Sequence, residues 1–248
     1  MQLISDVYPD FADLKERHFS GLRCVKKTVM IAFSPRSGST HLCAALHEAG
    51  QNWLPNEIFN PRGPAQYEAE KRSVKTFAEL IHTIDASDDE SFIFKTCWLD
   101  AEPISPFLTK LFPNLNVVHL VRRNDAAQAV SGYKAELSGV WHRSWDQQLP
   151  PPIPVSHFDI DRVLQIHANY QNENQRWINW FKTQNILPLR LTYESFQDDI
   201  NIALKQIVSK YNLNLRVDLP INAGMRKLSD ELSFRWTTTL QKRLFNMS

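Results

Sequence analysis

Long hydrophobic runs and a strong charge imbalance are both lacking from this sequence. No apolar stretch approaches the length of a membrane span, and the N-terminus has no basic region followed by an apolar core. We therefore expect neither a transmembrane segment nor a signal peptide. The formal net charge is +1 over 248 residues. Broad attraction to nucleic acid or to membranes is not expected, so any basic site must be local.

Cysteine is scarce as well. Cys24, Cys43 and Cys97 are odd in number and far apart in the sequence. They indicate neither a disulfide framework nor a zinc cluster, and they fit a reducing cytoplasm. We find no metal-ligand cluster, so no metal is expected, and we find no internal repeat. The chain is long enough to bury one sizeable core, which predicts a single α/β domain over residues 1–248.

Residues 29–40, with the sequence Val-Met-Ile-Ala-Phe-Ser-Pro-Arg-Ser-Gly-Ser-Thr, carry the clearest chemical signal. The first part is a short apolar run rich in branched residues, which is typical of a buried strand. Pro35 ends this strand because it has no N–H to donate to a neighbouring strand. Gly38 allows a positive φ or a close approach of the backbone to a ligand. The pattern predicts a strand, a tight loop and then a helix.

The end of this loop has the composition of an anion site. Ser39 and Thr40 are residue types that cap helices, and the helical pattern after them stops at Gly50. Backbone N–H groups and the positive end of the helix dipole would converge at the loop. Arg36 adds a full positive charge, and the two hydroxyls add donors. The loop is therefore expected to hold an anion, most simply a phosphate.

Other interpretations of the loop remain open. It could be an ordinary strand-to-helix turn that uses Ser and Gly for geometry alone. It is not a Walker A loop, because that motif is longer and has a Lys before the Ser or Thr, whereas here the cation precedes the glycine. Nor does it match the G-x-G-x-x-G fingerprint of dinucleotide-binding folds.

Further apolar runs predict the other strands of a sheet. Residues 91–95 form one such run, and it ends in Lys95, which can point at a transferred group or simply lie in solvent at the strand end. Residues 116–121 form another, followed by Arg122-Arg123 and a helical pattern. Paired arginines at a strand-to-helix turn suit bidentate phosphate binding. Two such turns suggest a ligand with two separated anionic groups.

The loop at residues 53–64 is rich in proline and carries hydrophobic residues that would be poorly placed in solvent. It is a candidate wall of an acceptor pocket. Glu57, flanked by Ile58 and Phe59, could be partly desolvated, which raises the pKa of a carboxyl group and suits a general base. A surface acid in an ordinary loop is the alternative.

The sequence also predicts two further helices and a long loop. Residues 68–77 are expected to form a solvated helix, and a long helix is expected from Asp159 to about Lys182. Residues 139–156 lack periodicity, and Trp141 and Trp145 favour either a lid over a substrate or an anchor for the loop itself.

Taken together, the chain resembles sulfotransferases that use 3′-phosphoadenosine 5′-phosphosulfate (PAPS), and more closely the bacterial trehalose 2-sulfotransferase-like family. The resemblance covers about residues 28–245. Its specific parts are the Pro35-to-Thr40 loop, Pro55-Asn56-Glu57-Ile58-Phe59-Asn60, Phe94-Lys95 with Trp98, His119-Leu120-Val121-Arg122-Arg123 continuing to Ser131, and Trp180-Phe181 with Leu191-Thr192-Tyr193-Glu194.

This resemblance implies a fold and a set of roles. The fold would be a P-loop-type three-layer sandwich with a central, mostly parallel sheet flanked by helices. Glu57 would be the general base, with Arg36 and Lys95 stabilising charge on the leaving phosphate. The residues implied to bind PAPS, and its product PAP, are Arg36, Ser37, Gly38, Ser39, Thr40, Arg123, Ser131, Arg226 and Lys227.

The expected acceptor is a small molecule with a hydroxyl group, such as a sugar or a glycolipid, and the resemblance suggests a homodimer. Two rival functions stay open at this point. A P-loop kinase or nucleotide hydrolase would need Mg²⁺ and ATP. A non-catalytic protein of the same fold would bind PAP without transferring a group, because fold alone does not fix function.

Overall fold

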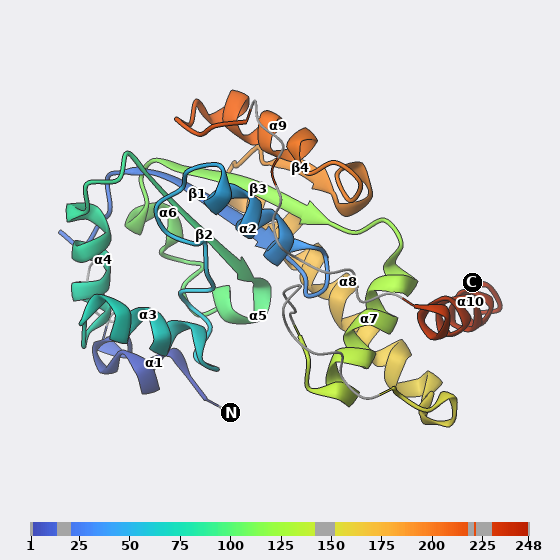
Figure 1. The fold of residues 1–248 in the computed structure, drawn as a ribbon. Helices are drawn as coiled ribbons and strands as arrows, with labels where there is room; N and C mark the ends of the chain where they lie inside the picture. The colour runs from blue at the N-terminus through green and yellow to red at the C-terminus, as the bar shows by residue number, and fades with distance from the viewer. Residues whose placement is uncertain (1, 14–20, 142–151, 218–220, 222–229, 248) are drawn as a thin grey trace.

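A computed structural model describes residues 2–13, 21–141, 152–217, 221 and 230–247. Within these ranges the chain forms one sheet of four parallel strands in the order β2-β1-β3-β4 (Figure 1). The strands are β1 (Lys27–Phe33), β2 (Ser91–Cys97), β3 (Leu115–Val121) and β4 (Leu189–Thr192). The predicted parallel sheet flanked by helices is confirmed.

Helices connect and cover the strands. In chain order they are α1 (Ile4–Val7), α2 (Ser39–Glu48), α3 (Pro64–Arg72), α4 (Phe77–Ala86), α5 (Trp98–Ala101), α6 (Leu108–Leu111), α7 (Asp125–Ser138), α8 (Ile160–Thr183), α9 (Asn201–Tyr211) and α10 (Glu231–Phe245). Short 3-10 turns occur at Pro9–Phe11, Val155–His157 and Tyr193–Ser195. No helix in the described ranges is long and apolar enough to cross a membrane.

The sheet is buried on both faces, which is why its strands read as continuous apolar runs. Side chains of β1 alternate between two hydrophobic clusters: Met30 and Ala32 face one, and Val29 and Ile31 face the other. The first cluster is covered by α3, α4, α6 and the C-terminal half of α8, and the second by α2 and α9. This arrangement gives the three layers of the predicted sandwich.

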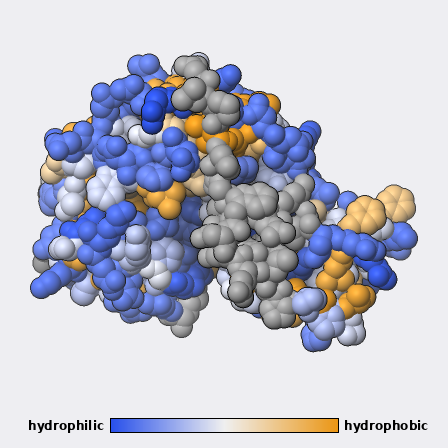
Figure 2. All heavy atoms as spheres, in the orientation of Figure 1, coloured by the Kyte–Doolittle hydropathy of each residue, from blue (hydrophilic) through white to orange (hydrophobic). Residues whose placement is uncertain are grey.

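A third cluster lies away from the sheet, where α7, α8 and α10 pack together. These helices form the arm that projects from the body in Figure 1. The visible face of the molecule is mostly hydrophilic, with hydrophobic side chains at the surface of this arm and of the upper part of the body (Figure 2). Phe234 and Phe245 of α10 are 73% and 82% exposed. The single domain over residues 1–248 stays a prediction.

The expected solvated helix at residues 68–77 is wrong in two respects. The chain breaks between α3 and α4, because Ser73 adopts a left-handed conformation and Thr76 caps α4 through a reciprocal capping box with Glu79. In addition, the face of α3 that carries Glu68 is buried. The long helix from Asp159, by contrast, is confirmed, and the Asp159 side chain accepts hydrogen bonds from two N–H groups of its first turn.

The topology indicates where a ligand can bind. From β1 the chain adds β2 on one side and β3 on the other, so the order of the sheet reverses between β1 and β3. In open parallel sheets ligands bind at the carboxyl ends of the strands beside such a reversal. The predicted anion loop follows β1 and the paired arginines follow β3, so both lie at this point.

Candidate active site

The anion loop between β1 and α2 has the backbone that its sequence predicts. Arg36 and Gly38 both have positive φ, at 65° and 90°. A Cβ atom on Gly38 would lie 2.5 Å from a ring carbon of Tyr193. Glycine is therefore required here both by the backbone conformation and by the tyrosine ring against the loop.

A buried glutamine on α7 holds the start of this loop. Gln128 Nε2 donates hydrogen bonds to Ser34 Oγ at 2.8 Å and to the Pro35 carbonyl oxygen at 2.7 Å. Gln128 is 1% exposed. The sequence interpretation gave it no role, although a glutamine on the apolar side of a helix is a signal that it has a polar partner.

Two polar atoms near the loop are buried without a hydrogen-bond partner in the described structure: Ser37 Oγ and Arg122 Nε. The Arg122 guanidinium lies 4.9 Å from the centre of the Tyr193 ring and donates a hydrogen bond of 3.3 Å to the Arg36 carbonyl oxygen. Burial lowers the pKa of Arg122, and burial together with the nearby Arg122 lowers the pKa of Arg36. Two desolvated cations and an unpaired hydroxyl fit an anionic group at this loop.

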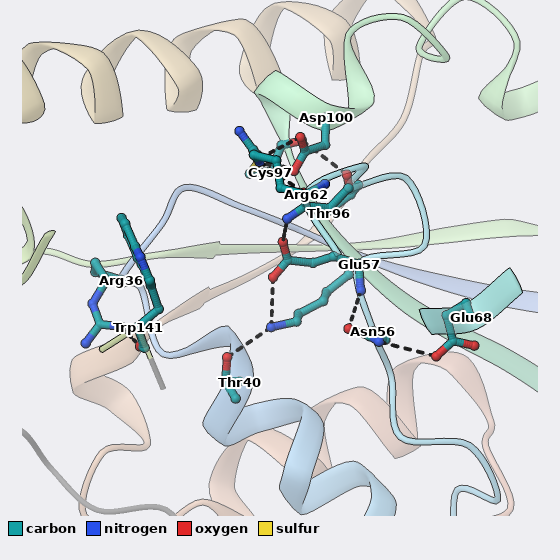
Figure 3. Close-up of polar contacts among 12 residues, drawn as sticks. Arg36, Thr40, Asn56, Glu57, Arg62, Glu68, Thr96, Cys97, Asp100 and Trp141 are labelled. Atoms are coloured by element: carbon teal, nitrogen blue, oxygen red, sulfur yellow. Dashed lines mark hydrogen bonds and ion pairs between the residues drawn. The ribbon is translucent and has the colours of Figure 1, made fainter. Parts of the chain in front are cut away.

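Arg36 also contacts Ser131, which was predicted to bind a second phosphate. The Arg36 Nε donates to Ser131 Oγ at 2.9 Å. Another of its nitrogens donates to the carbonyl oxygen of Trp141, just beyond α7 (Figure 3). The structure thus brings the anion loop and the middle of α7 into contact.

The two arginines after β3 have different surroundings. Arg123 has a side chain that is 68% exposed and lies 3.8 Å from the Glu194 carboxylate. The same carboxylate accepts hydrogen bonds from the N–H groups of Arg123 and Asn124, at 2.9 and 3.0 Å. Glu194 therefore fixes the turn, and Arg122 is the arginine that contacts the anion loop. The predicted role of Arg123 toward a 3′-phosphate stays a prediction.

Lys95 connects the anion loop to the loop that carries Glu57. Its Nζ donates to Thr40 Oγ1 at 2.9 Å and lies 3.1 Å from Glu57 Oε1 (Figure 3). The side chains of Lys95 and Glu57 are only 5% and 14% exposed. The predicted base and the predicted anion site are therefore joined by one ammonium group at the end of β2.

The surroundings of Glu57 differ from those expected. Ile58 and Phe59 turn into the hydrophobic core rather than around the carboxylate. Glu57 instead contacts polar groups, because Asn60 Nδ2 donates to its Oε2 at 2.7 Å in addition to the Lys95 ion pair. An ammonium and an amide therefore face this carboxylate, in place of the apolar surroundings that its neighbours in sequence suggested.

A second polar group, missed by sequence reasoning, lies at the end of β2. Arg62 donates to both carboxylate oxygens of Asp100, at 2.6 and 2.8 Å, and Cys97 Sγ lies 3.1 Å from the same carboxylate. Glu173 of α8 accepts a hydrogen bond of 3.2 Å from the Trp98 N–H. Burial raises the pKa of Glu173 to about 7, and the nearby Asp100 adds to the effect.

Replacing Glu173 by glutamine is expected to change how stability depends on pH. The folded protein holds a proton on Glu173 up to a pKa of about 7, against an ordinary value of 4.5. Wild-type stability therefore falls as pH rises through this window, by up to about 3 kcal/mol. In Glu173→Gln this loss is absent, so the variant gains on wild type between pH 5 and pH 8.

Urea unfolding at several pH values measures this effect. The control is Glu70→Gln on the exposed face of α3, which makes the same substitution at a carboxyl group that is not buried. A difference between Glu173→Gln and wild type that does not vary with pH would contradict the assignment.

Several predicted residues cannot be placed. Arg226, Lys227 and Trp145 lie outside the described residues. Ser39 and Thr40 begin α2, but neither side chain caps it, because the N-cap residue is Gly38. In the described part of the chain, no group of three His, Cys, Asp or Glu side chains is arranged to hold a metal ion.

Comparison with solved structures finds sulfotransferases at low sequence identity. The chain is similar to a sulfotransferase from Alicyclobacillus acidocaldarius, with 10% identity over 88% of this chain and 92% of that one and a TM-score of 0.48. It is also similar to the sulfotransferase domain from the curacin biosynthetic pathway, with 13% identity over 88% of this chain and 98% of that one and a TM-score of 0.49. A third similar structure is sulfotransferase STF9 from Mycobacterium avium, with 9% identity over 96% of this chain and 71% of that one and a TM-score of 0.44. No curated protein matches the chain significantly.

A sequence model of a protein family gives the stronger finding. It is described as Stf0 sulphotransferase and matches residues 99–243, more than half of the chain. The matched segment includes the paired arginines and Ser131 and begins after the anion loop and Glu57. The chain therefore belongs to the Stf0 sulphotransferase family.

Proposed function

We propose that this sulfotransferase moves a sulfuryl group from PAPS to a hydroxyl group of a carbohydrate or another small polar acceptor. The single observation that supports this most strongly is the bridge made by Lys95, which contacts Thr40 at the anion loop and Glu57 across from it. The donor site and the base would then lie on opposite sides of the Lys95 ammonium group. The sulfuryl group would be transferred between them, close to this ammonium group.

The residues around the loop fit the donor. The Ser37 hydroxyl and the Nε of Arg122 are buried and lack a hydrogen-bond partner among the described residues, and an anionic ligand would satisfy both. Arg36, Ser37, Gly38, Ser39 and Thr40 would bind the 5′-phosphosulfate. Ser131 would bind the 3′-phosphate together with one of the two arginines after β3. The resemblance implies Arg123 for this role, and the buried Arg122 is the alternative. Arg226 and Lys227 are further candidates.

The donor, when bound, supplies an activated sulfuryl group. Glu57 would accept the proton of the acceptor hydroxyl as its oxygen attacks the sulfur in line. As the bond between sulfur and the phosphate oxygen breaks, that oxygen would take up negative charge. Arg36, Lys95 and the loop N–H groups would stabilise this charge, because they are held in place before the reaction and are shielded from water.

The groups beyond Glu57 support a polar acceptor that carries no negative charge. Glu57, Asp100 and Glu173 contribute carboxyl groups near the end of β2, and the partly buried Trp98, whose N–H contacts Glu173, contributes an aromatic ring. Carboxylates and amides accept hydrogen bonds from hydroxyl groups, and a partly buried tryptophan suits the face of a sugar ring. Trehalose is therefore the first acceptor to test.

The test is transfer of radiolabelled sulfate from PAPS to a panel of mono- and disaccharides, with a chelator present. We expect label in at least one sugar. Transfer of label from γ-phosphate-labelled ATP with Mg²⁺, without transfer of label from PAPS, would support the kinase alternative. PAP binding without transfer to any acceptor would support a non-catalytic binder.

We also propose a cytoplasmic homodimer. Cys24, Cys43 and Cys97 are buried free thiols, in agreement with a reducing compartment. The exposed Phe234 and Phe245 of α10 offer an apolar surface for a second copy. Light scattering on the eluting protein distinguishes a monomer from a dimer.

A further inference from the structure

A buried ion pair on α3 has no role in the chemistry described above. Arg72 Nε lies 3.2 Å from Glu68 Oε2, and their side chains are 3% and 4% exposed. The Arg72 guanidinium also lies 4.3 Å from the centre of the Trp53 ring. Burying two charges costs desolvation energy that their attraction does not reliably repay. Such a pair is therefore weak evidence for stability, and its other contacts must be considered.

The ion pair is connected to the candidate base through one asparagine. Glu68 Oε1 accepts a hydrogen bond of 3.3 Å from Asn56 Nδ2. Asn56 Oδ1 in turn accepts the backbone N–H of Glu57 at 2.8 Å (Figure 3). The backbone carbonyl of Asn56 accepts the N–H of Lys95 at 3.1 Å. One residue thus contacts the loop that carries Glu57 and the strand that carries Lys95.

We propose that Asn56 and Glu68 are positioning residues, which hold Glu57 and Lys95 in the relative positions that proton transfer needs. This inference rests on the proposed function, in which Glu57 is the base. Neither residue would touch the substrate. Asn56 would act on Glu57 through its backbone, and Glu68 would act on Asn56 by fixing its side-chain amide.

The loop explains why such support is needed. Glu57 lies outside any helix or strand, in a segment interrupted by prolines. Its carbonyl oxygen accepts the Asn60 N–H in a turn, whereas its own N–H has the Asn56 side chain as partner. An asparagine amide can turn either its oxygen or its nitrogen toward Glu57. Because the Glu68 carboxylate only accepts, it selects the orientation in which the nitrogen faces Glu68 and the oxygen faces the Glu57 N–H. Arg72 in turn fixes the carboxylate of Glu68.

The first experiment is a crystal structure of Asn56→Ala, which does not depend on knowing the acceptor. We expect the separation between Glu57 Oε1 and Lys95 Nζ, 3.1 Å in the wild-type structure, to exceed about 4 Å, the limit of an ion pair. An Asn56→Ala structure that keeps the ion pair and the loop unchanged would overturn the proposal.

The second experiment is a double-mutant cycle on kcat, with PAPS and the best sugar of the panel. Asn56→Ala alone should lower kcat about tenfold, as misplacing a catalytic group does, with PAP affinity unchanged. In the Glu57→Gln background the same change should cost less than about twofold, because its effect passes through Glu57. A merely structural residue would cost the same in both backgrounds.

Glu68 is tested with variants that keep the fold. Glu68→Gln leaves Arg72 buried without its partner, so it is paired with Glu68→Gln/Arg72→Gln, in which both charges are removed together. Glu70→Gln on the exposed face of α3 is the matched control. We expect both Glu68 variants to lower kcat at unchanged PAP affinity, and the control to have wild-type kcat.

The two proposals fail in different ways. Wild-type activity in Glu57→Gln would remove Glu57 as the base, and the proposed mechanism with it. Loss of activity in Glu57→Gln together with full activity in Asn56→Ala and in the double Glu68/Arg72 variant would overturn the positioning role alone.

Discussion

Replacing Glu57 by glutamine is expected to lower turnover by about a hundredfold or more and to leave PAP affinity nearly unchanged. Glutamine keeps the size of the side chain and its hydrogen bond from Asn60, but it cannot take a proton from the acceptor. The donor site is spared because Glu57 contacts Lys95 rather than the anion loop itself. Steady-state kinetics together with a PAP titration measure the two quantities separately.

The Lys95 contact needs its own control in this experiment. Removing the Glu57 charge releases Lys95 from its ion pair, which alone could disturb Thr40. Unchanged PAP affinity in Glu57→Gln would show that the anion loop is intact. Turnover equal to wild type would remove Glu57 as the base and would direct attention to Glu173, whose carboxyl group accepts the Trp98 N–H.

Replacing Arg122 by alanine is expected to weaken PAP binding by about 10- to 100-fold. Its guanidinium is buried beside the anion loop, with a free Nε and one hydrogen bond to the Arg36 carbonyl oxygen. A charge-assisted hydrogen bond to phosphate is worth roughly 1.5–3 kcal/mol, which corresponds to this range. Arg123→Ala should cost about threefold or less, because that side chain is 68% exposed and pairs with Glu194.

Calorimetric titration of both variants with PAP decides between the two arginines. The reverse order, with the larger loss in Arg123→Ala, would mean that the turn after β3 rearranges when the nucleotide binds. In that case the role of Arg123 implied by the family resemblance would hold, and the contacts of Arg122 would be structural.

Local patterns in the sequence were enough to predict the sheet and the anion loop. Strands buried on both faces read as apolar runs, and Pro35 and Gly38 mark the loop that follows β1. Lys95 could be placed beside the site because the carboxyl ends of parallel strands share one edge. These features depend on residues that are neighbours in sequence or on a general rule of topology.

The supporting contacts could not be predicted because they join segments far apart in the chain. Glu68 looks like one acid among several on a charged helix, and only its packing against Asn56 and Arg72 shows that it is buried. Gln128 and Glu173 are similar cases, in which a polar residue on a helix meets a loop or a strand end. Which of Arg122 and Arg123 is buried depends on the backbone of the turn after β3. Glu194, from a distant segment, fixes that turn by accepting the Arg123 N–H.

The central claim is that the site binds the donor PAPS rather than ATP, and titration with PAP tests it most directly. The purified protein would be titrated calorimetrically with PAP in the presence of a chelator, and separately with ATP and Mg²⁺. We predict tight binding of PAP that does not need a metal ion, and little response to ATP. No PAP binding, or a preference for ATP with Mg²⁺, would contradict the assignment of the loop and of Ser131 as a PAPS site.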